Sequence, residues 1–136
     1  MKLIIGMVMI LLAGCSVNEF QHTVDEYQKA SRAIELGMTK QEVEQILDPT
    51  QTLLPSTSRR QSDRYMKDGV AVTILYYRSG WTSDGLTTDD EFTPHIFNDG
   101  KLVAIGWQVL GGVKSTGQVQ PVINNSSSSS STIIVY

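Results

Sequence analysis

The spacing of hydrophobic residues changes twice along this chain, and each change marks a different kind of element. Between residues 19 and 36 the apolar side chains recur at three- and four-residue steps, which predicts an amphipathic helix. Gly37 is typical of the end of such a helix, because glycine readily adopts the left-handed conformation that stops it. The apolar stripe of this helix consists of Phe20, Val24, Tyr27, Ala30 and Ile34.

The next segment has the strongest local signal for a helix. Thr39 fits the N-cap position, and Glu42, three residues later, completes a capping box. Pro49 ends the helix, because the residue before a proline is disfavoured in the α conformation. The short link at Gly37 predicts an αα hairpin. The apolar face of the second helix is Val43, Ile46 and Leu47.

From residue 64 onward the hydrophobic period falls to two, which predicts β-strands. Asp68-Gly69 and Asp99-Gly100 are hairpin turn signals, because such turns need positive φ angles. Polar residues at 50–62 and 79–91 predict loops. The expected strands are a short one at 64–66 and longer ones at 70–78, 92–97 and 102–109.

Two residues test the details of this strand assignment. Pro94 cannot donate a hydrogen bond to a neighbouring strand, so we expect it at a strand end, an edge or a bulge. Trp107 is expected on the last strand, where it would share one face with Val103 and Ile105.

The order of elements is therefore helix, helix and then three or four antiparallel strands. This order predicts an α+β fold, a two-helix hairpin packed on a three- to four-stranded antiparallel meander. A meander of this size offers one face to the helices, and we expect the other face to be exposed or covered by a partner.

The first fourteen residues follow a different pattern. Lys2 precedes an apolar run over residues 3–13, which is too short for the roughly 20 residues that a bilayer span needs. Small residues Ala13-Gly14 then precede Cys15, the only cysteine in the sequence. This arrangement is typical of a cleavable secretory signal peptide.

Leu12-Ala13-Gly14-Cys15 resembles the lipobox of bacterial lipoproteins. The resemblance implies a diacylglyceryl group on the thiol of Cys15, cleavage before Cys15, and an acyl chain on the new amine. The covalent lipid is the only added group that we expect. Ser16 stands where an aspartate commonly marks inner-membrane retention, which favours the outer membrane and its periplasmic face. The alternative is a cysteine that follows an ordinary signal peptide by chance.

These observations divide the chain into four parts. Residues 1–14 form the signal peptide and residues 15–18 a lipidated tether, and residues 19–112 form the folded domain. A Ser-rich flexible tail follows at 113–136, with six consecutive serines and an uncharged end of high β-propensity. That end, residues 132–136, either pairs with a sheet edge or is a disordered terminus.

Gly37 to Val43, with Ile46-Leu47 and Pro49 after it, resembles the helix signature of the SmpA/OmlA (BamE-like) small lipoproteins. The predicted hairpin at 96–103 matches the last hairpin of that family. The resemblance implies two helices on a three-stranded antiparallel sheet. Asp48 stands where the family usually has glycine, so the BamE role in β-barrel assembly does not follow from fold alone.

Residues 87–94, running on to Gly106-Trp107, are similar to an uncharacterised proteobacterial lipoprotein family of the same superfamily. The chain carries 11 basic and 14 acidic side chains, and no basic face that would indicate a nucleic-acid partner.

Catalytic and metal-binding patterns are weak in this sequence. His22 and His95 fall in different elements, and neither has a cysteine or carboxylate at metal-ligand spacing. Asp84 and its acidic neighbours offer oxygen ligands for a hard cation but lack EF-hand spacing, and turns explain them more simply. We therefore expect no enzyme and no metal site.

Partner binding is the leading functional expectation. Trp81 lies in a loop flanked by turn residues, and Asp89, Asp90 and Glu91 follow nearby, so these four are candidate contacts. We expect a non-enzymatic protein-binding or envelope-assembly accessory module with an envelope protein as its partner. The alternative is an inhibitor or immunity-type module of the β-lactamase-inhibitor-like fold, whose 79–91 loop would plug an active site.

Overall fold

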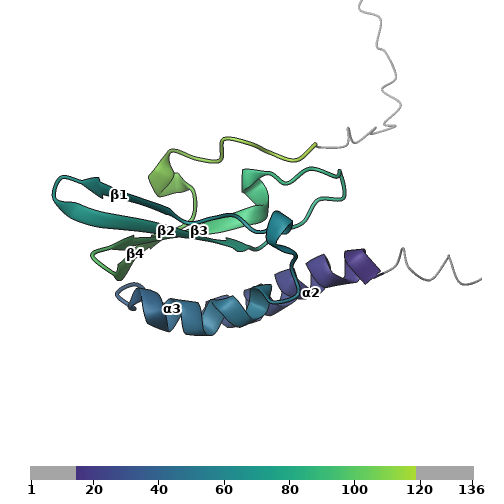
Figure 1. Ribbon diagram of the computed structural model, residues 1–136, viewed down its shortest axis with the longest axis horizontal. Helices are drawn as coiled ribbons and strands as arrows, with labels where there is room; N and C mark the ends of the chain where they lie inside the picture. Colours follow the sequence, from purple (N-terminus) through teal and green to yellow (C-terminus); the bar gives the residue numbers. More distant parts are fainter. Residues whose placement is uncertain (1–14, 119–136) are drawn as a thin grey trace, which may run out of the picture.

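Two helices cover one face of a four-stranded sheet in the computed structural model, which describes residues 15–118 (Figure 1). The helices are α2 (Cys15–Ala30) and α3 (Lys40–Leu47). The expected α+β fold, helices followed by a strand meander, is confirmed. The expected signal peptide at 1–14 and the tail beyond residue 118, including 132–136, lie outside the described residues.

The helix boundaries follow from local backbone chemistry. Helix α2 begins at Cys15, within the segment expected as a tether, and tightens into a 3₁₀ turn at Ser31–Ala33 instead of continuing to residue 36. The capping box of α3 forms as predicted. The Glu42 amide donates to Thr39 Oγ1 (3.2 Å), and the Thr39 amide donates to Glu42 Oε2 (2.7 Å).

Pro49 ends α3 but does not end the helical path. The chain continues as a 3₁₀ turn, η2 (Asp48–Gln51), with the proline in its first turn. A proline is tolerated there because the first amides of a helix have no internal partner.

The four strands form an antiparallel meander in which each strand pairs with its neighbours along the chain. Asp68 and Asp99 adopt positive φ angles, as does the glycine after each, so both predicted Asp-Gly turns are confirmed. The strands are β1 (Asp63–Lys67), β2 (Val70–Arg78), β3 (Phe92–Asn98) and β4 (Lys101–Ile105).

The last strand is shorter than expected, and the placement of Trp107 on it was wrong. Gly106 adopts a φ of +99°, which turns the chain away from the sheet directly after Ile105. Trp107 instead precedes a 3₁₀ turn, η5 (Gln108–Leu110), and its indole Nε1 donates to the carbonyl of Phe92 (2.7 Å).

Pro94 lies inside β3, opposite Tyr76 of β2. On the other side of β3 the pairing with β4 begins only at His95, which lies opposite Ile105. Pro94 accepts a bond from the Gly106 amide through its carbonyl (2.8 Å). It therefore lies just past the end of β4, where a missing N–H costs no ladder bond.

Both faces of the sheet are packed. The helix-facing core is Tyr27, Val43, Leu47, Tyr77, Phe97 and Leu102. On the other face, Val72, Ile74 and Ile96 cluster with Leu110 from η5. The far face, which we expected to be exposed or covered by a partner, is in part covered by this chain itself, because residues 106–118 fold back over the sheet opposite the helices (Figure 1). Tyr65, which lies opposite Val72 on that face, stays 46% exposed.

Candidate functional site

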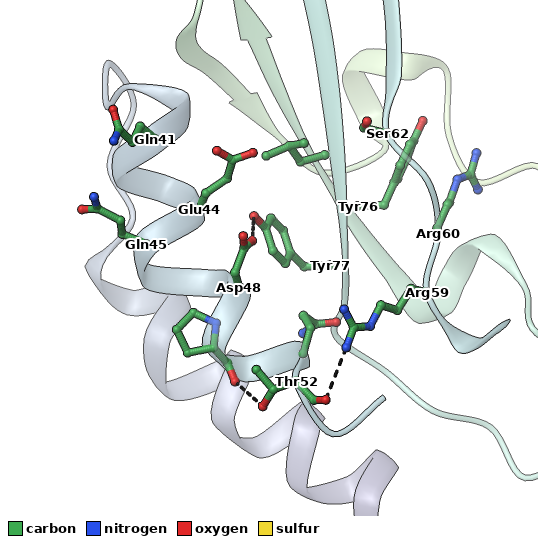
Figure 2. A pocket seen from close by; sticks show the side chains of 13 residues that line it. Gln41, Glu44, Gln45, Asp48, Thr52, Arg59, Arg60, Ser62, Tyr76 and Tyr77 are labelled. Carbon is green, nitrogen blue, oxygen red and sulfur yellow. Dashed lines mark hydrogen bonds between the residues drawn. The ribbon is translucent and has the colours of Figure 1, made fainter. Parts of the chain in front are cut away.

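A cleft of about 740 Å³ opens between α3 and the segment that leads into β1. We call it the α3 cleft. Glu44 and Asp48 project into it from α3 and η2, and Arg59 and Arg60 lie across from them (Figure 2). Between the two sides lies β2, which contributes Leu75, Tyr76 and Tyr77.

The acidic side of the α3 cleft is fixed by hydrogen bonds. The Tyr77 hydroxyl donates to Asp48 Oδ1 (2.8 Å), and Lys40 Nζ lies 2.5 Å from Glu44 Oε1. Burial, reinforced by the bond to Asp48, raises the pKa of the Tyr77 hydroxyl well above its ordinary value. Tyr77 therefore stays protonated and holds the Asp48 carboxylate in one orientation.

The basic side is held just as firmly. Arg59 donates through Nε to the Leu54 carbonyl (3.1 Å) and through Nη2 to the Thr52 carbonyl (3.3 Å). Its place at the rim is therefore set by the loop between η2 and β1.

Arg60 connects the α3 cleft to the far face of the sheet. Its guanidinium pairs with Asp89 and lies over the rings of Tyr76 (4.0 Å) and Trp107 (5.1 Å). Burial, with a bond to Asp63, raises the pKa of Tyr76 to about 12, so its hydroxyl is a donor at neutral pH. The Arg60 charge is shared between an ion pair and two aromatic faces, which keeps it in place.

Glu91, one of the candidate partner contacts, lies inside the domain. It is 2% exposed, and its Oε2 lies 3.1 Å from Nη1 of Arg78, which is 1% exposed. The same carboxylate accepts bonds from the amides of Thr82 (2.8 Å) and Thr88 (3.2 Å). A buried charge needs such partners, and here they tie the 79–91 loop to the end of β2.

Arg78 is the centre of a cluster that sequence reasoning missed. Its guanidinium lies over the rings of Phe20 (5.0 Å) and Phe92 (4.7 Å). The Gln51 side chain forms two hydrogen bonds with the backbone of Arg78. It accepts from the Arg78 amide (2.9 Å) and donates to the Arg78 carbonyl (3.3 Å). The sequence feature that could have predicted this cluster is the position of Arg78 at the end of an apolar strand, because an arginine buried there requires a partner for its charge.

The other candidate contacts keep some exposure. Trp81 is half-buried and stacks on Phe20, with ring centroids 5.9 Å apart. Asp89 pairs with Arg60, whereas Asp90 accepts bonds from the Gly117 amide (3.1 Å to Oδ2). The three acids share one short turn, η4 (Asp89–Glu91), yet each binds a different part of the domain. Their role in partner binding stays a prediction, as does that of Trp81.

Neither histidine lies in the α3 cleft. His22 is exposed on α2, whereas His95 is 1% exposed and packs edge-on against Tyr27 and Tyr77. Burial lowers the pKa of His95 to about 4, so it is neutral near pH 7. Among residues 15–118, no three or more histidine, cysteine or acidic side chains gather as a metal site would require.

Fold and site together define a small α+β domain with a mixed-charge cleft beside α3. The chain belongs to the family described as "Protein of unknown function (DUF3192)", whose model matches residues 7–110. Searches of curated proteins and of solved structures found no match. Within residues 15–118, the helices are too short or too polar to span a membrane. The Cys15 side chain lies outside what the structure describes.

Proposed function

We propose that this protein is a lipoprotein of the outer membrane that faces the periplasm and binds a segment of another envelope protein, without catalysing a reaction. The observation that carries the binding proposal is the α3 cleft, with carboxylates on one side and guanidinium groups on the other. Leu75, Tyr76 and Tyr77 between them supply apolar and aromatic surface. A polypeptide offers the matching mixture of charges, amides and apolar side chains.

The exposure of the rim favours a polypeptide over a small metabolite. Gln41, Asp48, Arg59 and Ser62 are all exposed. Small-molecule sites enclose most of the ligand surface, which a cleft with so exposed a rim does not do. A surface bordered by fixed charges gives orientation and specificity to a bound chain instead.

Photo-crosslinking in intact envelopes tests the binding proposal. A photoreactive residue replaces Gln41 on α3 or Ser62 on the opposite side, and we expect each to capture the same envelope protein. Gln28, an exposed glutamine on α2 outside the α3 cleft, is the matched control and should not capture it. Capture from Gln28 alone, or from none of the three positions, would contradict binding in the α3 cleft.

The membrane anchor is tested separately. Its support is the Leu12-Ala13-Gly14-Cys15 motif behind a short apolar run. Labelling with a palmitate analogue should mark the wild-type chain and leave Cys15→Ala unmarked, with the variant released from outer-membrane fractions. Equal labelling of the two chains would refute lipidation at Cys15.

An inhibitor is the second candidate function, favoured by the fixed 79–91 loop. The bonds from Thr82 and Thr88 to Glu91 hold this loop in one conformation, and preorganised loops bind enzyme clefts with little entropic cost. Inhibition of envelope hydrolases by the purified chain at micromolar concentration would favour this function over the accessory role.

A further inference from the structure

The outer edge of β1 is an open edge of the sheet within the described residues. Strand β1 is terminal in the order β1-β2-β3-β4, and all five of its residues are exposed. Tyr65 and Met66 are 46% and 68% exposed despite their apolar surface. Unpaired backbone groups at such an edge are a template for pairing with another strand.

The hairpin turn determines which backbone groups point outward. Asp68 and Gly69 both have positive φ angles, as in a two-residue type I′ turn, whose flanking pair is hydrogen-bonded. Lys67 lies opposite Val70 in that pair, and the hydrogen-bonded positions of an antiparallel ladder alternate. Arg64 and Met66 therefore direct their N–H and C=O groups away from β2.

The sequence of β1 is complementary to itself in the antiparallel direction. A two-fold axis at Tyr65 places Arg64 of one copy opposite Met66 of the other, so the outward backbone groups meet. The same register places Asp63 of each copy opposite Lys67 of the other. Opposite charges at such positions stabilise a strand pair, whereas like charges oppose it.

Neighbouring registers lose this match. A shift toward the start of β1 sets Arg64 opposite itself. A shift toward the turn sets Asp63 opposite Gly69 and Arg64 opposite Asp68, and both of these partners lie in the turn, outside β1, where the ladder does not continue. Charged side chains normally protect an open edge from pairing. Here their order selects one pairing, with a second copy of the same chain.

We propose that two copies of this protein pair through β1 to form a continuous eight-stranded sheet centred on Tyr65. Both copies then carry their helices on the same face of the joined sheet. Tyr65 meets its counterpart in a non-hydrogen-bonded pair, in which Cα atoms are about 4.5 Å apart. This pairing uses the sheet edge, and it goes beyond the proposed binding in the α3 cleft.

Disulfide trapping tests the register with the full chain in its membrane. Tyr65→Cys should form a covalent dimer under mild oxidation, because Cα atoms at this spacing suit a disulfide. Arg64→Cys, on the same strand, is the matched control and should stay largely monomeric, because its counterpart lies diagonally across the pair. The unsubstituted chain is oxidised in parallel to account for Cys15.

Substitutions that reverse the charges of Asp63 and Lys67 test the contribution of this pair to dimerisation. The measurement is light scattering of the detergent-solubilised full chain. Wild type should be dimeric, and Lys67→Asp should weaken dimerisation about tenfold or more, because each Asp63 then faces an aspartate. Adding Asp63→Lys to that variant restores opposite charges and should recover the dimer. Lys67→Asp alone keeps the Tyr76–Asp63 bond, so folding is preserved.

Two results would overturn the proposal. One is a monomeric wild-type chain at high micromolar concentration. The other is trapping of Tyr65→Cys that does not exceed trapping of Arg64→Cys. Trapping of neither variant is the result expected if residues 132–136 or another protein covered β1. Ser62 directly precedes β1 and lies near the second copy in the proposed dimer, whereas Gln41 on α3 does not. Loss of the dimer therefore leaves Gln41 crosslinking unaffected, so the failures of the two proposals are distinguishable.

Discussion

His95 illustrates at the residue scale how burial changes a side chain that sequence alone presents as ordinary. The ring lies between two tyrosines, Nδ1 contacts the Thr93 carbonyl at 3.2 Å, and Nε2 has no hydrogen-bond partner among the described residues. A neutral ring is tolerated in this position, whereas a charged one would lose its hydration without compensation.

Stability should therefore fall as the pH drops through the range below about 6.5. An unfolded chain binds a proton at His95 with an ordinary pKa of 6.5, whereas the folded chain binds it at about 4. Between these values protons favour the unfolded state, so lowering the pH from 7 to 5 should cost about 2 kcal/mol of unfolding free energy.

Urea unfolding at both pH values checks this prediction. His95→Phe keeps an aromatic ring between the tyrosines and should remove this part of the pH dependence. His22→Phe, which changes the exposed histidine of α2, should retain it. The same pH dependence in His95→Phe as in wild type would show that another group is responsible.

The sequence predicts residue roles well where the partner is close in the chain. Thr39 and Glu42 are three residues apart, and their capping box forms as predicted. Gln51 and Arg78 are 27 residues apart, and only the folded sheet brings them together. The α3 cleft was missed for the same reason, since its two sides come from separate segments.

At the scale of elements, the hydrophobic period predicted which segments form helices and strands, whereas the residues at which these elements end depend on local backbone conformation. Strand β2 has the predicted bounds because Ser79 and Gly80, which favour a loop, directly follow its last residue, Arg78. Strand β4 stops early because Gly106 takes a positive φ, which an apolar pattern does not encode.

The 79–91 loop is an element whose order depends on one buried carboxylate. Glu91→Gln keeps the shape of the side chain but leaves the Arg78 charge buried without a counterion. Breaking a buried pair in this way should lower the unfolding free energy by about 3–5 kcal/mol. Chemical denaturation of the purified chain measures the loss.

Glu35→Gln provides the matched control for that change. Glu35 is exposed in the link before α3, and its substitution should alter stability by less than about 0.5 kcal/mol. Similar stabilities for Glu91→Gln and Glu35→Gln would mean that the Arg78–Glu91 pair does not hold the loop.

At the scale of the molecule, the chain forms a third layer that the meander pattern did not predict. Residues 106–118 cover part of the sheet face opposite the helices (Figure 1). Trp107 fastens this layer, because its ring stacks on Tyr76 with centroids 5.7 Å apart and its Nε1 donates to Phe92. Arg60 adds a cation–π contact from the rim of the α3 cleft.

Trp107→Ala should therefore loosen the covering layer and destabilise the whole domain by about 2–3 kcal/mol, less than a fully buried tryptophan because the ring keeps some exposure. Val109→Ala is the control in the same segment, since Val109 is 66% exposed and its loss should be nearly neutral. Urea unfolding gives both values, and hydrogen exchange shows whether amides of 106–118 lose protection before those of α3. Equal stability of the two variants would mean that the layer rests on the sheet without stabilising it. A clear difference would instead show that Trp107 holds the 106–118 layer against the sheet.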